Sequence, residues 1–432
     1  MTDRLGQSAI QVLAASGTRQ LSASSSGSGI AIKWHPGHYM ASNTHWGLGQ
    51  TISSSGCQAE ISALLGSGSN VIGYSWLPRW SLFENTTLGV YDFSALDAVY
   101  TAVTGISKPG DTPTGKRLVV CWEGLVIYGS LIPVIPAYIY NNPGTYGAGS
   151  DGTHGGYTNF VSGTGATPAL WRSSVMNRFI ALNQAMGARI SPSGNPYETD
   201  PYFEGIKSWE LTAPTLGQID YTESGYIGQT QAFFQAAVSA FPHTNIVGNN
   251  NYIGGDTLAC ANMTSFLQKN RCGISAPDLF GETCILNQAG LNTGINVAGC
   301  LADGLRAYIG SANAGASFPA GFSDSRGLMP CWPTIEQPEM DGSGFHGYGS
   351  PWVPQDFFNN ALQTLSLANN AGGVSHLFWT YLVGNSPAIQ DPTTKRNTGT
   401  QPGNWGSVLA AINANPIPFI GQPANYPAIN TA

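Results

Sequence analysis

Short apolar segments alternate with longer amphipathic segments from Gly29 to the end of the chain. Eight short segments can be counted, and all but the fourth and seventh are mostly apolar, as buried parallel strands are. This alternation predicts repeated βα units around a parallel sheet. The predicted strands cover Ile30–Trp34, Val71–Trp76, Leu118–Trp122, Phe203–Trp209, Asn245–Asn249, Leu279–Thr283, Leu328–Ile335 and Val374–Thr380.

The amphipathic segments predict the helices that would cover such a sheet. They include Gln58–Leu65, Ser94–Val103, Ala169–Met186, Gln229–Phe241, Thr257–Lys269, Cys300–Ile309, Pro354–Ala368 and Gly406–Ala414. Eight units favour closure into an α/β fold of the (β/α)₈ TIM-barrel type, with long loops on its catalytic face. An open doubly wound sheet is disfavoured because no Gly-rich dinucleotide signature follows the first strand.

The pattern divides the chain into two parts. Residues 1–28 end in the Ser-rich run Ser22–Ser28, which is typical of a flexible N-terminal arm or linker. Residues 29–432 are predicted to form the barrel domain. Its long connection Gly124–Pro168 is rich in Gly and Tyr, so it is either an ordered wall over a groove or a disordered insertion.

Composition narrows the classes of ligand. Charged residues make up 9% of the 432 residues and the formal net charge is −7. A polar, weakly charged surface suits neutral sugars and opposes a polyanionic partner, so nucleic acid is not expected. Runs of about 18 apolar residues are missing, so neither a membrane span nor a membrane partner is expected. The start of the chain does not resemble a signal peptide, although an extracellular, surface or virion-associated location is expected.

The seven cysteines contain no CxxC pair, so a structural zinc site is not expected. Cys260 with Cys272, and Cys284 with Cys300, are spaced for disulfides that close loops of modest size. Buried free thiols are the equal alternative. The sequence leaves the disulfide connectivity and the oligomeric state open.

Only ten glutamates occur in the chain, and four of them lie at or just beyond predicted strand ends. These are Glu123, Glu210, Glu282 and Glu336, which follow or end the third, fourth, sixth and seventh strands. Barrel enzymes carry their catalytic groups on this face. Two carboxyls across a scissile bond are what glycoside hydrolysis requires, one as acid and one as nucleophile or base.

Three stretches carry a family resemblance. They are Ser208-Trp209-Glu210-Leu211 with Pro333-Thr334-Ile335-Glu336, then Trp80–Glu84 followed by Gly89–Asp97, and finally Leu377–Tyr381. They resemble the clan A glycoside hydrolases, which are retaining (β/α)₈ enzymes. The resemblance implies that Glu210 is the acid/base, Glu336 is the nucleophile and Trp379 is the floor of a sugar subsite. It implies a glycosidase acting on a neutral oligosaccharide or polysaccharide, without a cofactor.

Trp209 departs from this pattern, because the family usually carries Asn immediately before the acid/base. Asn249, Asn250 and Asn251 lie at the end of the fifth strand and are candidates to replace it. Glu339 is a local rival to Glu336, but Pro338 should end the strand before it. Ser94 is expected to cap a helix, with Asp97 at the capping-box position.

Further side chains near strand ends are predicted to contact the sugar. Glu123 and Glu282 have an alternative role as partners of arginines such as Arg79. His35 and His38 are expected to bind sugar or a carboxylate rather than a metal, because no third ligand is apparent. The full set of predicted substrate contacts is Trp379, His35, His38, Trp76, Trp122, Glu123, Trp209, Asn250, Tyr252 and Glu282.

Two other functions remain open from the sequence. One is a non-catalytic carbohydrate-binding or receptor-binding protein built on the same barrel. The other is a different barrel enzyme, such as a lyase or a metal-assisted hydrolase that uses the histidines, because fold alone does not fix chemistry.

Overall fold

The structure is a computed structural model of the chain, and all that follows concerns the residues it describes. They are residues 31–42, 55–124, 135–159, 166–211, 220–250, 257–275, 329–335, 375–381, 405–414 and 429–430. The predicted N-terminal arm, residues 1–28, lies outside them. The predicted helices Cys300–Ile309 and Pro354–Ala368 also lie outside them.

Eight parallel strands form one sheet in which neighbours follow one another in chain order. The last strand pairs with the first, and a parallel bridge between Ile274 and Cys331 joins the sixth strand to the segment before the seventh. The ring confirms the predicted (β/α)₈ barrel. Its strands are β2 (Gly37–Ala41), β3 (Val71–Trp76), β4 (Arg117–Cys121), β7 (Phe203–Glu210), β8 (Asn245–Asn249), β9 (Gly273–Ser275), β10 (Thr334–Ile335) and β11 (His376–Thr380).

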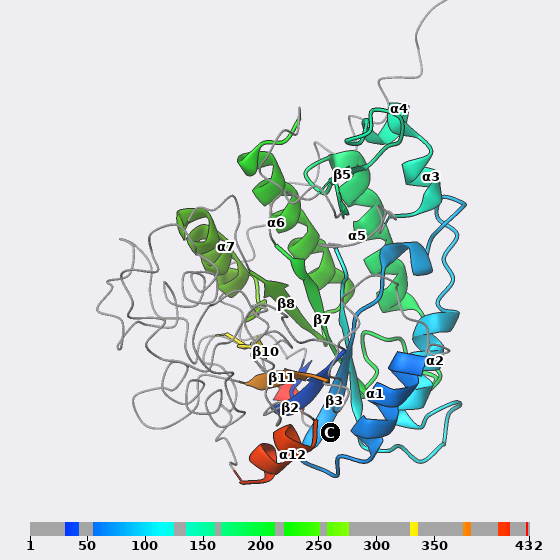
Figure 1. Ribbon diagram of the computed structural model, residues 1–432, viewed down its shortest axis with the longest axis vertical. Helices are drawn as coiled ribbons and strands as arrows, with labels where there is room; N and C mark the ends of the chain where they lie inside the picture. The colour runs from blue at the N-terminus through cyan, green and yellow to red at the C-terminus, as the bar shows by residue number, and fades with distance from the viewer. Residues whose placement is uncertain are drawn as a thin grey trace, which may run out of the picture.

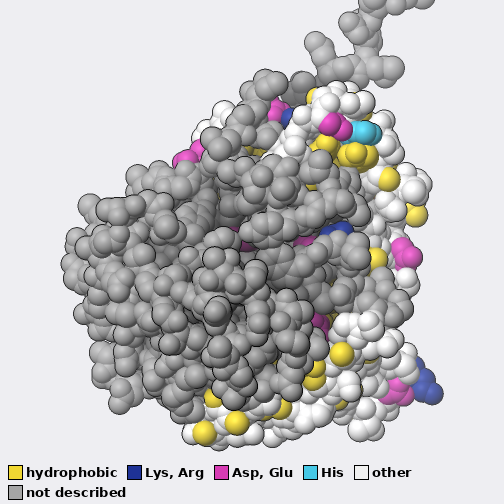
Figure 2. All heavy atoms as spheres, in the orientation of Figure 1, with side chains coloured by type: hydrophobic (Ala, Val, Ile, Leu, Met, Phe, Trp, Pro, Cys, Tyr) yellow, Lys and Arg dark blue, Asp and Glu magenta, His cyan; other side chains and the backbone are white. Residues whose placement is uncertain are grey.

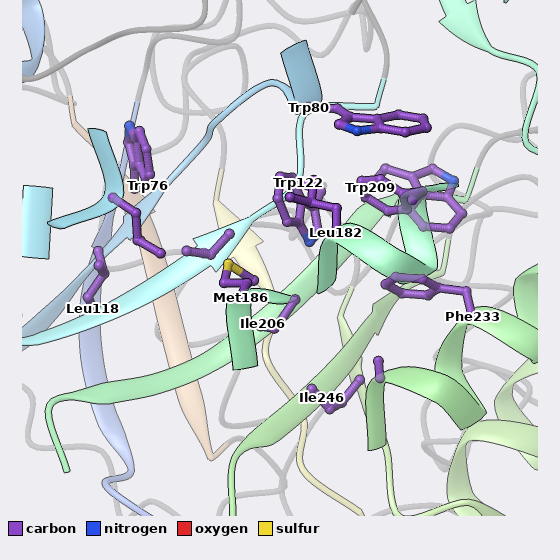
Figure 3. Packing of buried hydrophobic residues seen from close by; sticks show 14 of the residues in the cluster. Trp76, Trp80, Leu118, Trp122, Leu182, Met186, Ile206, Trp209, Phe233 and Ile246 are labelled. Atoms are coloured by element: carbon purple, nitrogen blue, oxygen red, sulfur yellow. The ribbon is translucent and has the colours of Figure 1, made fainter. Parts of the chain in front are cut away.

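Helices cover the outer surface of the ring (Figure 1). Their apolar faces and the outward side chains of the strands form one large core cluster, part of which Figure 3 shows between β4, β7 and the neighbouring helices. The helices are α1 (Ser55–Leu65), α2 (Ser94–Thr104), α5 (Ser173–Ala188), α6 (Glu223–Ala240), α7 (Thr257–Lys269) and α12 (Trp405–Ala414), with the 3₁₀ turn η1 (Trp80–Leu82) between β3 and α2.

Two strands differ from the prediction. The first barrel strand is β2, and the predicted strand Ile30–Trp34 instead contributes β1 (Ile32–Lys33), which pairs with β12 (Ile429–Asn430) outside the ring. The sixth is β9, six residues before the predicted Leu279–Thr283, which lies outside the described residues. Apolar runs reveal that a segment is buried, but they do not reveal which neighbour it pairs with.

The barrel interior is filled rather than hollow. A second core cluster inside the ring contains Tyr39, Val119, Val247, Trp332 and Phe378. Glycines make room for these large rings: a Cβ at position 73 would collide with the Tyr39 ring, and one at position 205 with the Trp332 ring. Aromatic side chains therefore occupy volume that branched aliphatics usually fill in such barrels.

The helix α2 starts differently from the prediction. Its first residue is Ser94, whose backbone N–H donates to Asp92 Oδ1 at 2.9 Å, and no side chain of the preceding residue Phe93 caps it. Asp97 does not close a capping box but accepts from Arg189 and Tyr197. Asp92 replaces Ser94 as the cap because its carboxylate reaches the free N–H two residues on.

The connection after β4 is ordered where the structure describes it. It contains α3 (Ala137–Tyr140), α4 (Pro143–Tyr146) and an antiparallel pair of β5 (Tyr157–Asn159) with β6 (Ala166–Pro168). Arg172, just before α5, donates to the carbonyls of Tyr146 and Ala148 and so fastens this segment to the helix layer. The expectation of a disordered insertion is therefore wrong for these residues.

The described surface carries few charges. In the view of Figure 2, blue and magenta side chains are scattered among white atoms. No helix within the described ranges is long and apolar enough to cross a membrane. Cys57, Cys121, Cys272 and Cys331 are buried free thiols, which contradicts a disulfide between Cys272 and Cys260. The other predicted disulfide lies outside the described residues.

Candidate active site at the carboxyl ends of the strands

Glu210 is the last residue of β7, at the carboxyl end of the fourth barrel strand. Trp209 and Leu211 on either side of it belong to the outer core cluster, so alternation places the Glu210 side chain on the inner face. It is half-buried, whereas the seven residues before it in the strand are buried. Glu210 therefore faces the mouth of the barrel, as predicted for a catalytic group.

A register shift in β7 produces this orientation. Lys207 pairs with Val247 and Glu210 pairs with Asn249, so three residues of β7 lie opposite two of β8. The Ser208 hydroxyl fills the gap by accepting the Asn249 backbone N–H at 2.9 Å. Such a bulge redirects the side chains that follow it. It turns Glu210 inward and Trp209 outward.

Asn249 is the asparagine closest to Glu210 in the sheet. It shares the inner face of β8 with Val247, which lies in the barrel cluster, and it is 7% exposed. Its Oδ1 has no hydrogen-bond partner among the described residues. Asn250 points the other way, since its Nδ2 donates to Thr264 Oγ1 of α7 at 2.8 Å. The structure thus favours Asn249 over the predicted Asn250 as the group beside Glu210.

Glu123 follows β4 on the same face, where it is engaged in a buried ion pair. Arg79 Nε donates to Glu123 Oε2 at 2.8 Å, and the two residues also form a parallel bridge that joins the loops after β3 and β4. The Arg79 side chain is 7% exposed and that of Glu123 is 3% exposed. The alternative expected from the sequence, that Glu123 is a partner of Arg79, is therefore correct.

The motif Trp80–Glu84 has a structural role in the loop after β3. Glu84 accepts from Trp80 Nε1 at 3.2 Å and from the Gly89 backbone N–H at 2.6 Å. Arg178 of α5 binds Glu84 at 2.6 Å and donates to the Tyr138 hydroxyl of α3 at 3.2 Å. One arginine thus connects the loop after β3 with the segment after β4, which together form one wall of the catalytic face.

The four tryptophans predicted to contact sugar lie instead in the core. Three of them point to the helix layer, as Figure 3 shows for Trp76, Trp122 and Trp209. Trp122 Nε1 donates to Asn183 of α5 at 3.0 Å, and Trp209 Nε1 donates to Tyr226 of α6 at 3.0 Å. Trp379 is fully buried and belongs to the same cluster. These predictions are corrected because alternation along the strands sends each indole outward.

The two predicted histidines do not reach the mouth of the barrel. His38 lies within β2 and accepts from Trp379 Nε1 at 3.2 Å, and burial lowers its pKa to about 3. His35 lies before β2 at the amino-terminal end of the ring, where its Nδ1 binds Glu204 at 2.6 Å. Glu204 and Glu210 are six residues apart on β7, about 20 Å along an extended strand.

The amino-terminal end of the barrel is closed by a buried polar cluster around Glu204. Its carboxylate accepts from His35, His376 and Asn245. Burial raises the pKa of Glu204, but the hydrogen bonds and charges of His35 and His376 outweigh it and hold this pKa well below its usual range. Burial lowers the pKa of His376. A second register shift, between Leu118 and Val119 of β4, accommodates Glu204. Because its polar groups bind one another in the interior, this cluster stabilises the amino-terminal end of the barrel and does not form a substrate site.

Glu336, Glu339, Tyr252 and Glu282 lie outside the described residues. Glu336 follows Ile335, the last residue of β10, directly in the sequence. Within the described ranges, no group of three or more His, Cys, Asp or Glu side chains is arranged to hold a metal ion. Sequence reasoning missed Ser208, and it named Asn249 only as one of three candidate asparagines. The consecutive polar residues Lys207 and Ser208 interrupt the alternation of β7, which is the sequence hint of a bulge.

No family model matches the chain, and no curated protein matches its sequence. Solved structures that resemble it include the endo-β-1,4-mannanase from Thermotoga petrophila, at 10% identity and a TM-score of 0.46, covering 89% of this chain and 76% of that one. The catalytic domain of β-amylase from Paenibacillus polymyxa has 10% identity and a TM-score of 0.49, with 81% and 93% covered. Endo-glycoceramidase II from Rhodococcus sp. has 10% identity and a TM-score of 0.46, with 89% and 80% covered.

Likeness at this level of identity concerns the fold alone. By its own strand order the chain is a (β/α)₈ barrel, the fold implied by its resemblance to clan A glycoside hydrolases.

Proposed function

We propose that this chain is a glycoside hydrolase that cleaves a neutral oligosaccharide or polysaccharide, with Glu210 as acid/base and Glu336 as nucleophile. The observation that carries the proposal is the bulge in β7, which turns Glu210 into the barrel mouth at the carboxyl end of the fourth strand. This is the face on which barrel enzymes perform their chemistry. The assignment of Glu336 rests on its position directly after β10.

In the proposed reaction, Glu210 protonates the glycosidic oxygen while the carboxylate of Glu336 attacks the anomeric carbon. The leaving group departs with the proton, and a covalent glycosyl ester remains on Glu336. Glu210, now ionised, removes a proton from water, which releases the sugar with retained configuration. Such a mechanism requires the two carboxyl groups to be about 5 to 5.5 Å apart.

Asn249 is the proposed substrate-positioning group. Its side chain is on the inner face beside Glu210, and its amide can donate to and accept from a sugar hydroxyl. Trp209 occupies the sequence position of the family asparagine but contributes its indole to the core. We infer that Asn249 contacts the substrate from the neighbouring strand.

Glycan hydrolysis by single-carboxyl variants tests the proposal. With a panel of neutral glycans, Glu210→Gln and Glu336→Gln should each lower kcat by about 10² to 10⁴. The matched control is Glu198→Gln, since Glu198 precedes β7 at the opposite end of the barrel and binds His243. NMR of the first product formed should show the anomeric configuration of the substrate.

Two results would contradict the proposal. One is unchanged hydrolysis in Glu210→Gln with the fold intact. The other is a wild-type protein that binds glycans in calorimetry but releases no reducing ends, which would identify a carbohydrate-binding barrel instead. A product of inverted anomeric configuration would still support a glycoside hydrolase, but it would contradict the role of Glu336 as nucleophile.

A further inference from the structure

Residues Ile32–His35 lie across the amino-terminal end of the barrel, and we call this segment the strap. Its strand β1 is two residues long and pairs with β12 outside the ring. The Lys33 backbone N–H donates to the His243 carbonyl at 3.0 Å, and the Lys33 carbonyl accepts from Asn245 at 2.7 Å. The strap is thus a short outer segment attached to the ring, and it is not one of the barrel strands.

The strap covers a carboxylate and an imidazole of the barrel interior. His35 Nδ1 binds Glu204 Oε2 at 2.6 Å, and the His35 backbone N–H donates to Glu204 Oε1 at 3.1 Å. Trp34 contacts the His376 ring edge-on, with 5.6 Å between the ring centres. Glu204 and His376 are fully buried and lie 3.2 Å apart, from Oε1 to Nε2. Because the strap lies outside the ring, lifting it would open both groups to water.

Lys33 is the ionisable group that the strap itself buries, and it is 2% exposed. Its Nζ donates to the carbonyls of Tyr197 and Asp200, at 3.3 and 2.9 Å, and lies 5.4 Å from the centre of the Phe203 ring. Burial lowers the pKa of Lys33 from its ordinary 10.5 to about 7, although nearby carboxylates act in the opposite direction. The closed strap therefore binds the proton of Lys33 less tightly than water-exposed chain does.

His376 behaves in the same way, because burial is the largest cause of its lowered pKa. When the strap lifts, water reaches both groups and each pKa returns towards its ordinary value. The open state then binds more protons than the closed state, so a fall in pH favours opening. The effect of Lys33 extends from about pH 10.5 to 7, and that of His376 begins near pH 6.5.

The other titratable groups that face these two side chains do not reverse the sign. Glu204 has a pKa well below its usual range, so it stays ionised over this interval. The pKa of Tyr39 is raised well above its ordinary value by burial, so Tyr39 stays neutral. The groups that face His376 are His35 of the strap, Tyr39 of β2 and Glu204 of β7, and those that face Lys33 are Arg117 of β4, Tyr197, Glu198 with its partner His243, Asp200 and Glu204.

We propose that the strap is a pH-dependent latch, closed over the amino-terminal end of the barrel at neutral and alkaline pH and opened by acid while the barrel stays folded. Segments with few buried contacts open at a lower free energy than the core to which they are attached. The latch lies at the end of β7 away from Glu210, so its opening leaves the carboxyl-end face in place. It operates whether or not the chain hydrolyses a glycan.

Hydrogen exchange followed by NMR measures the opening of the strap directly. The Lys33 and His35 amides are hydrogen-bonded in the closed state, so each exchanges when the strap opens. After correction for the intrinsic exchange rate, their opening constant should rise about tenfold between pH 6.5 and 5, and about 10- to 100-fold between pH 9 and 7. The amides of Val119 and Val120 in β4 should stay protected throughout.

Two variants separate the contributions, and the slopes with pH are compared, not the absolute opening constants. His376→Gln keeps an amide donor for Glu204 but does not titrate, so it should flatten the rise below pH 6.5 and keep the rise above pH 7. Lys33→Met keeps the apolar stem but does not titrate, so it should do the reverse. His154→Gln, in the more exposed pair with Asp151, is the matched control and should behave as the wild type does.

An opening constant of the strap that does not change with pH would overturn the latch. Exchange of the Val119 amide in step with the strap amides would show global unfolding and would overturn it as well. An unaltered slope in folded His376→Gln would overturn the role of His376. If His376→Gln does not fold, the wild-type profile and the loss of the alkaline rise in Lys33→Met decide between the latch and global unfolding.

Discussion

Glu210 pairs with Asn249 in the ladder between β7 and β8, directly after a bulge in β7. The Ser208 hydroxyl stabilises the bulge by accepting a hydrogen bond from the Asn249 backbone N–H. The pairing brings a carboxyl and an amide together on the inner face of the barrel. The proposed acid/base and the proposed substrate-positioning group therefore lie on adjacent strands, although they are 39 positions apart in the chain.

The two neighbouring asparagines allow a matched experiment. Asn249→Ala should lower kcat/KM by about 10- to 100-fold, because it removes a group that meets the substrate, while stability changes by about 1 kcal/mol. Asn250→Ala should leave activity per folded molecule unchanged and lower the free energy of unfolding by about 1–3 kcal/mol, since Thr264 loses its partner. Initial rates measure the activity and urea unfolding measures the stability of each variant. If Asn250→Ala lost activity and Asn249→Ala only lost stability, Asn250 would be the substrate-positioning residue instead.

Breaking the ion pair between Arg79 and Glu123 should destabilise the fold strongly. Glu123→Gln keeps the shape but leaves a buried guanidinium without its counter-charge, which costs about 3–5 kcal/mol. The control Asp151→Asn weakens the more exposed pair with His154 and should cost less than about 1 kcal/mol. If Glu123→Gln and Asp151→Asn lowered the free energy of unfolding equally in chemical denaturation, burial would not make the pair of Arg79 and Glu123 more important for stability.

Stability should fall as the pH drops below 6.5, in part because of His38. Its pKa is lowered to about 3 by burial, so the folded state favours the neutral ring. A lowered pKa means that stability is complete above the unfolded value of about 6.5 and is lost towards pH 3. Between pH 6.5 and 5 the loss amounts to about 2 kcal/mol.

The variant His38→Asn isolates this contribution, because the amide oxygen can still accept from Trp379 and does not titrate. Its unfolding free energy should decline less steeply than that of the wild type over the same interval. His376, whose pKa is also lowered, accounts for part of the remaining slope. Parallel slopes in the two proteins would show that the pKa of His38 is not lowered in the folded state.

Replacing a core tryptophan should affect stability without affecting sugar binding. Trp122→Phe removes the hydrogen bond to Asn183 and part of a buried ring, so the free energy of unfolding should fall by about 1–3 kcal/mol. The dissociation constant for a glycan, measured by calorimetry on Glu210→Gln, should not change. A tenfold weaker affinity would restore Trp122 as a sugar contact.

Periodicity predicted the barrel because each buried strand leaves a local apolar signature. Seven of the eight predicted strands have a described counterpart, and the bounds are exact for Val71–Trp76 and Asn245–Asn249. It failed at the first strand, where Pro36 and Gly37 resemble the end of a strand although β2 begins at Gly37. The sequence also predicted that the tryptophans at strand ends contact a sugar. The face on which Trp209 points depends on a bulge that only the pairing with β8 reveals.

The position of Glu210 at a strand end could be predicted because only ten glutamates occur, and it is one of the four that lie at or just beyond predicted strand ends. Asn249 and Glu204 could not be singled out, since their importance arises from neighbours on other strands. The contact between Glu204 and His376 spans 172 positions in the chain. Likewise, the sequence offered His35 as a sugar contact, while its partner Glu204 shows that it belongs to the opposite end of the barrel.

The residues around β1 lie across the amino-terminal end of the barrel. The backbone N–H of Lys33 donates to the carbonyl of His243, which precedes β8, and its own carbonyl accepts from Asn245. The chain therefore enters the barrel at β1 on the side away from Glu210.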